Sequence, residues 1–259
     1  MKTSEKATDQ TETINQHSTI AAPTALTVGE IAARDFRKAA VFQKFGIDFC
    51  CGGGISLEEA SKKAGISESE LCSALRLTDL EPIAPDRDFA KWDLDKLADY
   101  IVDIHHRYVR DNAAILLDIA RKVAGHHGKN HPELLEMDNR VRRSLHDLLA
   151  HMEKEEKHLF PAIRHLADLE KSHERTGKAQ FQFIRYAVEK MQNEHSTCGE
   201  DLRHFRLLTN NYTLPEGACT SYKFLFDKLQ EFETDLQQHI HLESNILFPR
   251  AVATLDDQK

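Results

Sequence analysis

The segment HMEKEEKHLFP (residues 151–161) recurs later in the chain as HIHLESNILFP (residues 239–249), and both copies fit the pattern H-x3-E-x3-L-F-P. Residues four apart on an α-helix share one face, so each copy presents an imidazole and a carboxylate together. Iron, manganese and zinc all accept this pair of ligand types. A single pair is weak evidence for a metal, but two copies with the same flanks predict a site between two helices. We expect the shared Leu-Phe-Pro to end each helix.

The composition is typical of a globular helical protein. Among 259 residues, 29% are charged, 41% are hydrophobic, and only 11 are glycine and 7 proline, which favours helices. The net charge of −8 argues against binding to nucleic acid. No apolar run is long enough to cross a membrane. Residues 1–26 are polar and lack the layout of a secretory signal, so we expect a disordered tail on a cytoplasmic protein.

The five cysteines do not form a regular framework. Their odd number and irregular spacing argue against structural disulfides, and in a reducing cytosol they would be free, metal-binding or redox-active. They are Cys50, Cys51, Cys72, Cys198 and Cys219. The 15 histidines are many for this length, and several lie near the two repeated segments, which again points to a metal.

Residues 27–78 predict a small helical module. Thr27, Ser56 and Ser67 each precede a glutamate by three residues, which is the pattern of a capping box. We therefore expect three short helices, the first from residue 28 to residue 45 and ended by Gly46. The adjacent pair Cys50-Cys51 lies in a glycine-rich turn between them, and residues 79–92, with two prolines, form the linker.

Residues 93–252 predict a four-helix bundle. Apolar residues recur with helical spacing over about residues 94–123, 132–160, 179–208 and 216–248, separated by mostly short connections. Four such helices form an up-down-up-down bundle, and facing helices of a bundle often hold a metal in its core. The fold class is therefore all-α, with the small module ahead of the bundle.

The first and third helices must complete a dinuclear site. His105 has only core-compatible neighbours three and four residues away, whereas His106 has Asp103 and Arg110 among its neighbours, so we expect His105 to point inward. His195 is the central histidine of the third helix. The weaker candidates are His158 and His241, and His126, His127 and His131 in a solvated turn. Asp147 and Glu194 either tune protons or guide iron, or are only polar residues of the bundle.

The repeated segments resemble those of hemerythrin-like di-iron domains. The turn Asp48-Phe-Cys-Cys-Gly-Gly53 resembles the N-terminal module of the iron–sulfur cluster repair family, also called repair of iron centres or the ScdA/YtfE family. Together the two matches cover about residues 27–252. The pairing of both motifs in one chain is more specific than either alone.

The resemblance implies a ligand set. The family's first-helix histidine follows an Ile-Val pair by three residues, and here Ile101-Val102 precedes His105 in that way. Glu194-His195 fits the family's Glu-His pair on the third helix. The implied ligands of two non-haem iron ions (Fe2+/Fe3+) are His105, His151, Glu155, His195, His239 and Glu243. An oxo bridge and the carboxylates Glu155 and Glu243 would join the irons, and Cys50 and Cys51 would be the characteristic thiol pair.

One departure from the oxygen-carrying hemerythrins is informative. Their third helix resembles H-x3-H, whereas Gly199 stands at the second of those positions here, and their fourth helix resembles H-x4-D rather than H-x3-E. Fewer imidazoles leave more open coordination, which favours chemistry or iron exchange over reversible carriage of one ligand.

The resemblance implies repair of iron–sulfur clusters damaged by nitric oxide or oxidants. Iron donation to a damaged cluster and reduction of nitric oxide are alternative mechanisms, which leaves open whether the chain is an enzyme. The rival hypothesis is a hemerythrin-type carrier or sensor of oxygen or nitric oxide, which does not need Cys50 and Cys51. The implied partners are damaged iron–sulfur proteins, nitric oxide or oxygen, and a second copy of the chain in a homodimer.

Overall fold

The computed structural model describes residues 26–80 and 88–257. Every regular element in these ranges is a helix, which confirms the all-α prediction. The predicted tail, residues 1–26, lies almost wholly outside the described residues, as do residues 81–87 of the predicted linker. The described remainder of the linker contains the short 3₁₀ turns η1 (Thr78–Leu80) and η3 (Phe89–Lys91).

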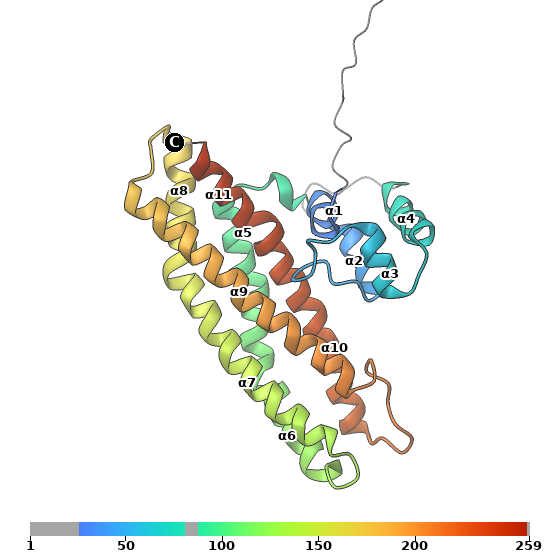
Figure 1. The fold of residues 1–259 in the computed structure, drawn as a ribbon. Helices are drawn as coiled ribbons and strands as arrows, with labels where there is room; N and C mark the ends of the chain where they lie inside the picture. The colour runs from blue at the N-terminus through green and yellow to red at the C-terminus, as the bar shows by residue number, and fades with distance from the viewer. Residues whose placement is uncertain (1–25, 81–87, 258–259) are drawn as a thin grey trace, which may run out of the picture.

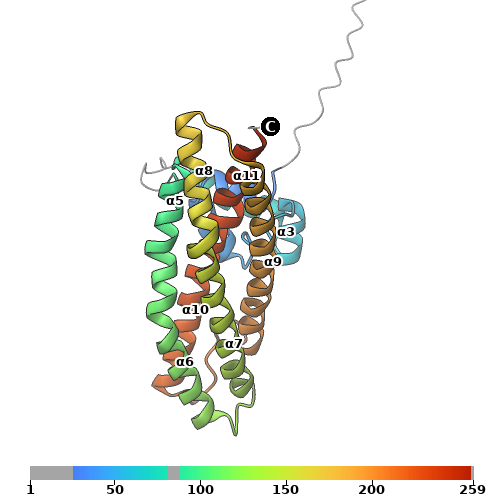
Figure 2. The ribbon, with the colours of Figure 1, turned by 90° about the vertical axis from the view of Figure 1, so that its left-hand side faces the viewer.

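Four long helical stretches form the bundle, and each runs antiparallel to the next along the chain (Figures 1 and 2). The first comprises α5 (Leu94–Tyr100), η4 (Ile101–His106) and α6 (Arg107–His127). The second comprises α7 (Glu133–Lys154), η5 (Glu155–Leu159) and α8 (Phe160–Ser172). The third is α9 (Lys178–Leu208), and the fourth comprises α10 (Thr220–His241), η6 (Leu242–Leu247) and α11 (Phe248–Asp256).

The segments η4, η5 and η6 are π-helical turns within otherwise α-helical stretches. In a π turn the backbone hydrogen bond reaches back five residues instead of four. The amide of Phe160 accordingly donates to the carbonyl of Glu155, and that of Phe248 donates to the carbonyl of Glu243. Single π turns occur often at functional sites.

The prediction that Leu-Phe-Pro ends each helix was wrong. The second stretch continues through Pro161 for about three further turns, and the fourth continues through Pro249 for about two. Proline lacks an amide hydrogen, and its ring crowds the carbonyl four residues back. The π turn before each proline already opens the four-residue hydrogen-bond ladder, so the helix can continue.

The N-terminal module contains the helices α1 (Val28–Arg34), α2 (Arg37–Lys44), α3 (Leu57–Ala64) and α4 (Glu68–Leu77). The predicted single helix over residues 28–45 was wrong, because the backbone at Asp35 is extended and its carboxylate accepts from the amide and guanidinium of Arg37. The capping box at Thr27 is complete. Ser56 and Ser67 each accept from the predicted amide three residues on.

A polar layer divides the apolar core of the bundle into two parts. One core cluster contains side chains of α6, α7 and α10 together with the N-terminal module, and the other contains side chains of α5, α8 and α11. Each fully buried Leu, Ile, Phe or Met side chain in these clusters contributes about 1.5–3 kcal/mol to folding. The repeated segments lie at the boundary, so they have packed apolar layers on both sides. In the described ranges, none of the helices combines the length and apolar character needed to cross a membrane.

Candidate metal centre

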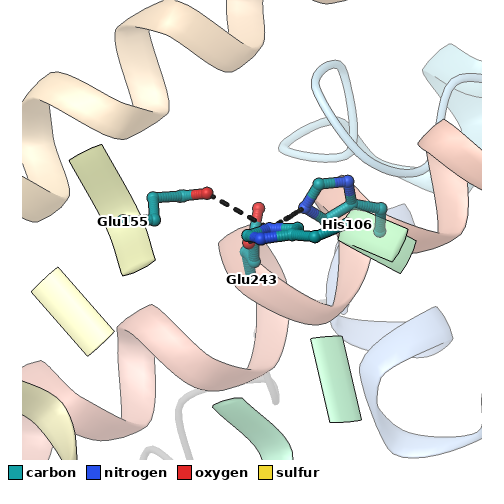
Figure 3. A group of neighbouring side chains, drawn as sticks. His106, Glu155 and Glu243 are labelled. Atoms are coloured by element: carbon teal, nitrogen blue, oxygen red, sulfur yellow. Dashed lines mark hydrogen bonds and ion pairs between the residues drawn. The ribbon is translucent and has the colours of Figure 1, made fainter. Parts of the chain in front are cut away.

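Six side chains from all four stretches of the bundle meet in the polar layer. They form two overlapping groups whose ligand atoms lie within 4.8 Å of one another: His106, Glu155, His239 and Glu243, and His151, Glu155, His195 and Glu243. Glu155 and Glu243 belong to both groups. Figure 3 shows His106, Glu155 and Glu243 converging from different helices.

The distances define two imidazole pairs with two carboxylates between them. His106 Nε2 lies 3.1 Å from His239 Nε2, and His195 Nε2 lies 3.0 Å from His151 Nε2. Glu243 directs Oε1 to His239, at 3.1 Å, and Oε2 to His195, also at 3.1 Å.

Glu155 spans the two pairs in the same way. Its Oε2 lies 3.5 Å from His106 Nε2, and its Oε1 lies 3.3 Å from His151 Nε2. Each carboxylate therefore reaches both imidazole pairs, as a ligand that bridges two metal ions must.

The structure places His106, and not His105, in this cluster. His106 joins the cluster, whereas His105 points elsewhere: its Nδ1 lies 2.9 Å from Asp235, and its ring stacks on His239 at 5.8 Å. The π turn η4 explains the difference, because it places His106 five residues after the fully buried Ile101. The other five predicted ligands all lie in the cluster.

The cluster is suited to a metal because its polar atoms lack other partners. Glu155 and Glu243 are fully buried, and both oxygens of Glu155 and Oε2 of Glu243 have no hydrogen-bond donor. A buried ionised carboxylate costs several kcal/mol unless a positive charge compensates it. A cation between the imidazole pairs would satisfy the carboxylates and also relieve the close approach of ring nitrogens. The residues present therefore fit a dinuclear metal site.

Without a metal, protons take over part of this compensation. Burial opposes protonation of His106, but its contacts with Glu155 and Glu243 raise its pKa to about 9. Burial likewise opposes protonation of His151, but the charge of Glu155 raises its pKa to about 10. Burial would raise the pKa of Glu243, yet His239 and the other imidazoles hold it well below its ordinary value. The cluster thus favours positive charge at its centre.

Outer hydrogen bonds orient three of the four imidazoles. His106 Nδ1 lies 2.7 Å from Glu156, and His151 Nδ1 lies 2.9 Å from Glu194. His195 Nδ1 lies 2.8 Å from the hydroxyl of Ser244. Carboxylates behind metal-binding histidines fix the ring orientation and raise ligand basicity.

The two outer carboxylates are themselves paired with cations. Arg110 donates to Glu156 at 2.5 Å, and Lys154 donates to Glu194 at 2.7 Å. The bond from His151, aided by Lys154, lowers the pKa of Glu194 to about 2. The sequence left two interpretations of Glu194 open, proton tuning or iron guidance and a polar bundle residue, and Glu156 had no predicted role. The carboxylates that face His106 and His151 can therefore stay ionised at any physiological pH.

A cavity of 280 Å³ reaches the cluster between α7 and α9. Three of the six clustered residues line this cavity: His151, His195 and His239. Its wall also contains the charged residues Asp147, Lys154 and Glu194. The cavity gives small molecules and ions a route to one side of the site. The side lined by His106 faces packed residues instead, since His106 is fully buried and stacks on Phe160 at 5.6 Å.

The thiol pair lies against the backbone of a clustered residue. Cys51 Sγ donates to the carbonyl oxygen of His195 at 3.1 Å, and Cys50 Sγ lies 3.8 Å from Cys51 Sγ. Cys50 also contacts Asp48 Oδ1 at 3.4 Å. Its bond with Cys51 and its burial raise the pKa of the Cys50 thiol. The turn thus holds the thiol pair one backbone carbonyl away from the candidate metal site.

Gly199 makes this contact feasible. A Cβ atom at Gly199 would lie 2.9 Å from both Cβ and Sγ of Cys51, closer than real side-chain contacts. Gly199 occupies the second histidine position of the H-x3-H pattern on the third helix of oxygen-carrying hemerythrins. In this chain the turn that contains Cys50 and Cys51 packs on α9 at that position. The sequence showed that glycine stands in place of a histidine at position 199, but it did not show that Cys51 packs there.

The remaining predicted candidates lie outside the cluster. His158 is exposed, which agrees with its weaker standing. His241 is fully buried between Phe36 and Phe49 of the N-terminal module, and burial lowers its pKa to about 4. Its Nδ1 accepts from Asn245 Nδ2 at 2.9 Å. It therefore anchors the module to α10 rather than binding metal.

A helical bundle with two H-x3-E pairs around shared buried carboxylates defines a hemerythrin-like metal-binding protein. Comparison with known families agrees: residues 97–251 match the Hemerythrin HHE cation binding domain, and residues 24–79 match ScdA_N, a domain of unknown function. The chain belongs to the family of iron–sulfur cluster repair proteins, as its similarity to curated relatives shows.

Three of these relatives illustrate the extent of the match. The chain is 34% identical over 227 residues to the iron–sulfur cluster repair protein YtfE of Pectobacterium atrosepticum, covering 87% of this chain and 96% of the relative. It is 32% identical over 215 residues to a probable iron–sulfur cluster repair protein of Haemophilus influenzae, covering 82% and 90%. It is 31% identical over 222 residues to the repair protein ScdA of Staphylococcus haemolyticus, covering 85% and 95%.

Proposed function

We propose that this protein is a di-iron protein that repairs iron–sulfur clusters damaged by oxidative or nitrosative stress. The observation that carries the proposal is the pair of buried carboxylates, Glu155 and Glu243, each of which spans both imidazole pairs. The names of the relatives support the repair function. Two bound iron ions would supply exchangeable iron and redox chemistry at this place.

The ligands divide into two sets around the shared carboxylates. His106 and His239 would hold one iron, and His151 and His195 the other, because their Nε2 atoms pair at 3.1 and 3.0 Å. Glu156, Glu194 and Ser244 would orient the imidazoles. Two imidazoles and two shared carboxylate oxygens leave coordination positions open at each iron, which favours exchange and small-ligand binding.

The cavity between α7 and α9 would serve as the route for iron or nitric oxide. Asp147 and Glu194 on its wall favour the passage of cations, and Lys154 holds Glu194 against His151. Iron leaving by this route would come from the His151–His195 side. Damaged iron–sulfur proteins are then the partners that receive it.

The thiol pair would act beside the His195 end of the site. Cys50 and Cys51 could accept released iron, or they could provide electrons for nitric oxide. In the second case two nitric oxide molecules take two electrons and two protons from two thiols, which gives nitrous oxide, water and a Cys50–Cys51 disulfide. The sulfur atoms, now 3.8 Å apart, would approach to about 2.05 Å. The free thiols suit a reducing compartment such as the cytoplasm.

The first experiment combines metal analysis with repair. The purified wild-type protein should contain close to two irons per chain and restore activity to an enzyme whose iron–sulfur cluster has been destroyed by nitric oxide. Glu243→Leu should lose most of the iron and the repair activity. Unchanged iron in this variant would overturn the ligand set.

A second variant separates repair from ligand carriage. Cys50→Ser/Cys51→Ser should keep the iron and its optical spectrum but lose repair. A carrier or sensor of oxygen or nitric oxide would not need the thiols. Full repair by the double variant, with reversible nitric oxide binding, would favour that rival function.

A further inference from the structure

The end of the bundle where α6 meets α7 lies away from the N-terminal module (Figures 1 and 2). The residues at this end include a second group with metal-ligand side chains. His126 and His127 end α6, His131 lies in the turn before α7, and Cys219 immediately precedes α10. The three histidines were predicted to form a solvated turn, and Cys219 had no assigned role. The structure brings the thiol into this turn.

The contacts are specific. His127 Nε2 lies 3.1 Å from Cys219 Sγ, and the rings of His127 and His131 lie 6.4 Å apart. The buried ring of Tyr222 contacts both imidazoles, at 5.3 Å and 5.6 Å, and so supports them from the core side. Cys219, His127 and His131 are all partly exposed, so an ion from solvent can reach them.

His131 also has the outer contact of a metal-binding histidine. Its Nδ1 lies 3.0 Å from Glu133 Oε1, which leaves Nε2 free for a ligand bond. Histidines that bind metals nearly always have a carboxylate, carbonyl or water on the other ring nitrogen. The same arrangement recurs in this molecule at His106 and His151.

We propose that Cys219, His127 and His131 bind a divalent cation of borderline softness, with zinc the best match. One sulfur and two nitrogen ligands, with water in the fourth position, are typical of tetrahedral zinc. Zinc–sulfur and zinc–nitrogen bonds of about 2.3 Å and 2.0 Å set the sulfur–nitrogen separation near 3.6 Å. The His127–Cys219 contact must therefore open by about half an ångström. The ring of His131, whose centroid lies 6.4 Å from that of His127, must approach the other two ligands.

This site differs from the candidate iron centre in place and in chemistry. Twenty-one residues of helix separate His106 from His127, which corresponds to about 30 Å. Carboxylate-rich sites suit iron, whereas a thiolate selects softer ions such as zinc. A bound zinc would join the end of α6, the start of α10 and the turn before α7.

The test uses the full, iron-loaded chain dialysed against zinc. Wild type should retain its iron and bind one zinc in addition, and Cys219→Ser should lose that zinc. Cys72→Ser is the matched control, since Cys72 is also partly exposed but lies in the N-terminal module. Cobalt(II) in place of zinc should give a thiolate charge-transfer band in wild type and in Cys72→Ser, and no such band in Cys219→Ser.

Two further variants test the imidazoles. His127→Ala should abolish zinc binding, and Glu133→Gln should weaken it roughly 10–100-fold through loss of the outer contact. Iron content and helical circular dichroism, unchanged in each variant, show that the bundle has folded. The proposal is overturned if wild type binds no additional zinc, if zinc uptake equals iron loss, or if Cys219→Ser binds zinc like wild type.

Discussion

Glu155 and Glu243 are the residues on which the centre depends most. Both are fully buried, and their unpartnered oxygens lie between imidazoles rather than beside backbone donors. Replacing one of them by an apolar residue removes a shared ligand from both halves of the site. Replacing a single histidine, in contrast, removes a ligand from one half only.

His106→Ala and His105→Ala form a matched pair of neighbouring substitutions. His106→Ala should leave close to one iron per chain, because it removes an imidazole from the half that contains His239. His105→Ala should retain close to two, since its hydrogen bond is to Asp235. Iron analysis of both variants decides between them, and loss of iron from His105→Ala alone would restore the ligand set first predicted.

Most of the clustered residues could be predicted from residue spacing, but His106 could not be chosen in that way. The i, i+4 rule applies to His151–Glu155 and His239–Glu243 because each pair lies within one helical turn. Between Ile101 and Val109 the π turn adds a residue, so the cluster contains His106, five residues after the buried Ile101, and not His105, four residues after it. Val109 lies four residues after His105 and three after His106, so counting back from the buried residues of α6 does not separate the two histidines.

The π turns are the elements that sequence periodicity could not reveal. They carry His106, Glu155 and Glu243, so half of the clustered residues lie in π-helical turns. Pattern analysis assumes about 3.6 residues per turn, and a proline normally predicts the end of a helix. The helix starts and the capping serines were predictable because they depend on local hydrogen bonds. The π turns depend on packing around the site.

The contact between the Cys50–Cys51 turn and α9 leads to a prediction about the stability of two glycine variants. A Gly→Ala change inside an exposed helix usually stabilises it by about 1 kcal/mol. Gly125→Ala, in α6, should do so because a Cβ there has no neighbour within 4 Å. Gly199→Ala should instead be less stable than Gly125→Ala by about 1–3 kcal/mol, since its Cβ would overlap Cys51.

Chemical denaturation of the two variants measures this difference. Thiol labelling supplies a second measurement, because Cys51 displaced from His195 should react faster in Gly199→Ala than in Gly125→Ala. Equal stabilisation of both variants, with equal labelling, would show that the turn does not pack on α9 in solution.

At the scale of the whole molecule, the bundle holds a charged layer between two apolar cores. The N-terminal module contributes buried side chains of α1, α2, α3 and α4 to one of these cores, and it packs Ala33 and Phe36 against the other. The layer itself has more buried polar atoms than hydrogen-bond partners. Its contribution to folding therefore depends on which cations it contains, metal ions or protons.

This dependence predicts how stability changes with pH. The folded pKa values of His106 and His151, about 9 and about 10, lie above the ordinary value of 6.5. In metal-free protein their protonation should stabilise the fold fully below pH 6.5, and this contribution should be lost as the pH rises through 9 to 10. In loaded protein the metal replaces these protons, so the same rise in pH should have less effect on stability.

Thermal unfolding of both forms from pH 6 to pH 10 measures the difference, with His106→Gln as a control that weakens the pH dependence of the metal-free form. A metal-free form that loses no stability relative to the loaded form over this range would show that protons do not compensate the buried carboxylates.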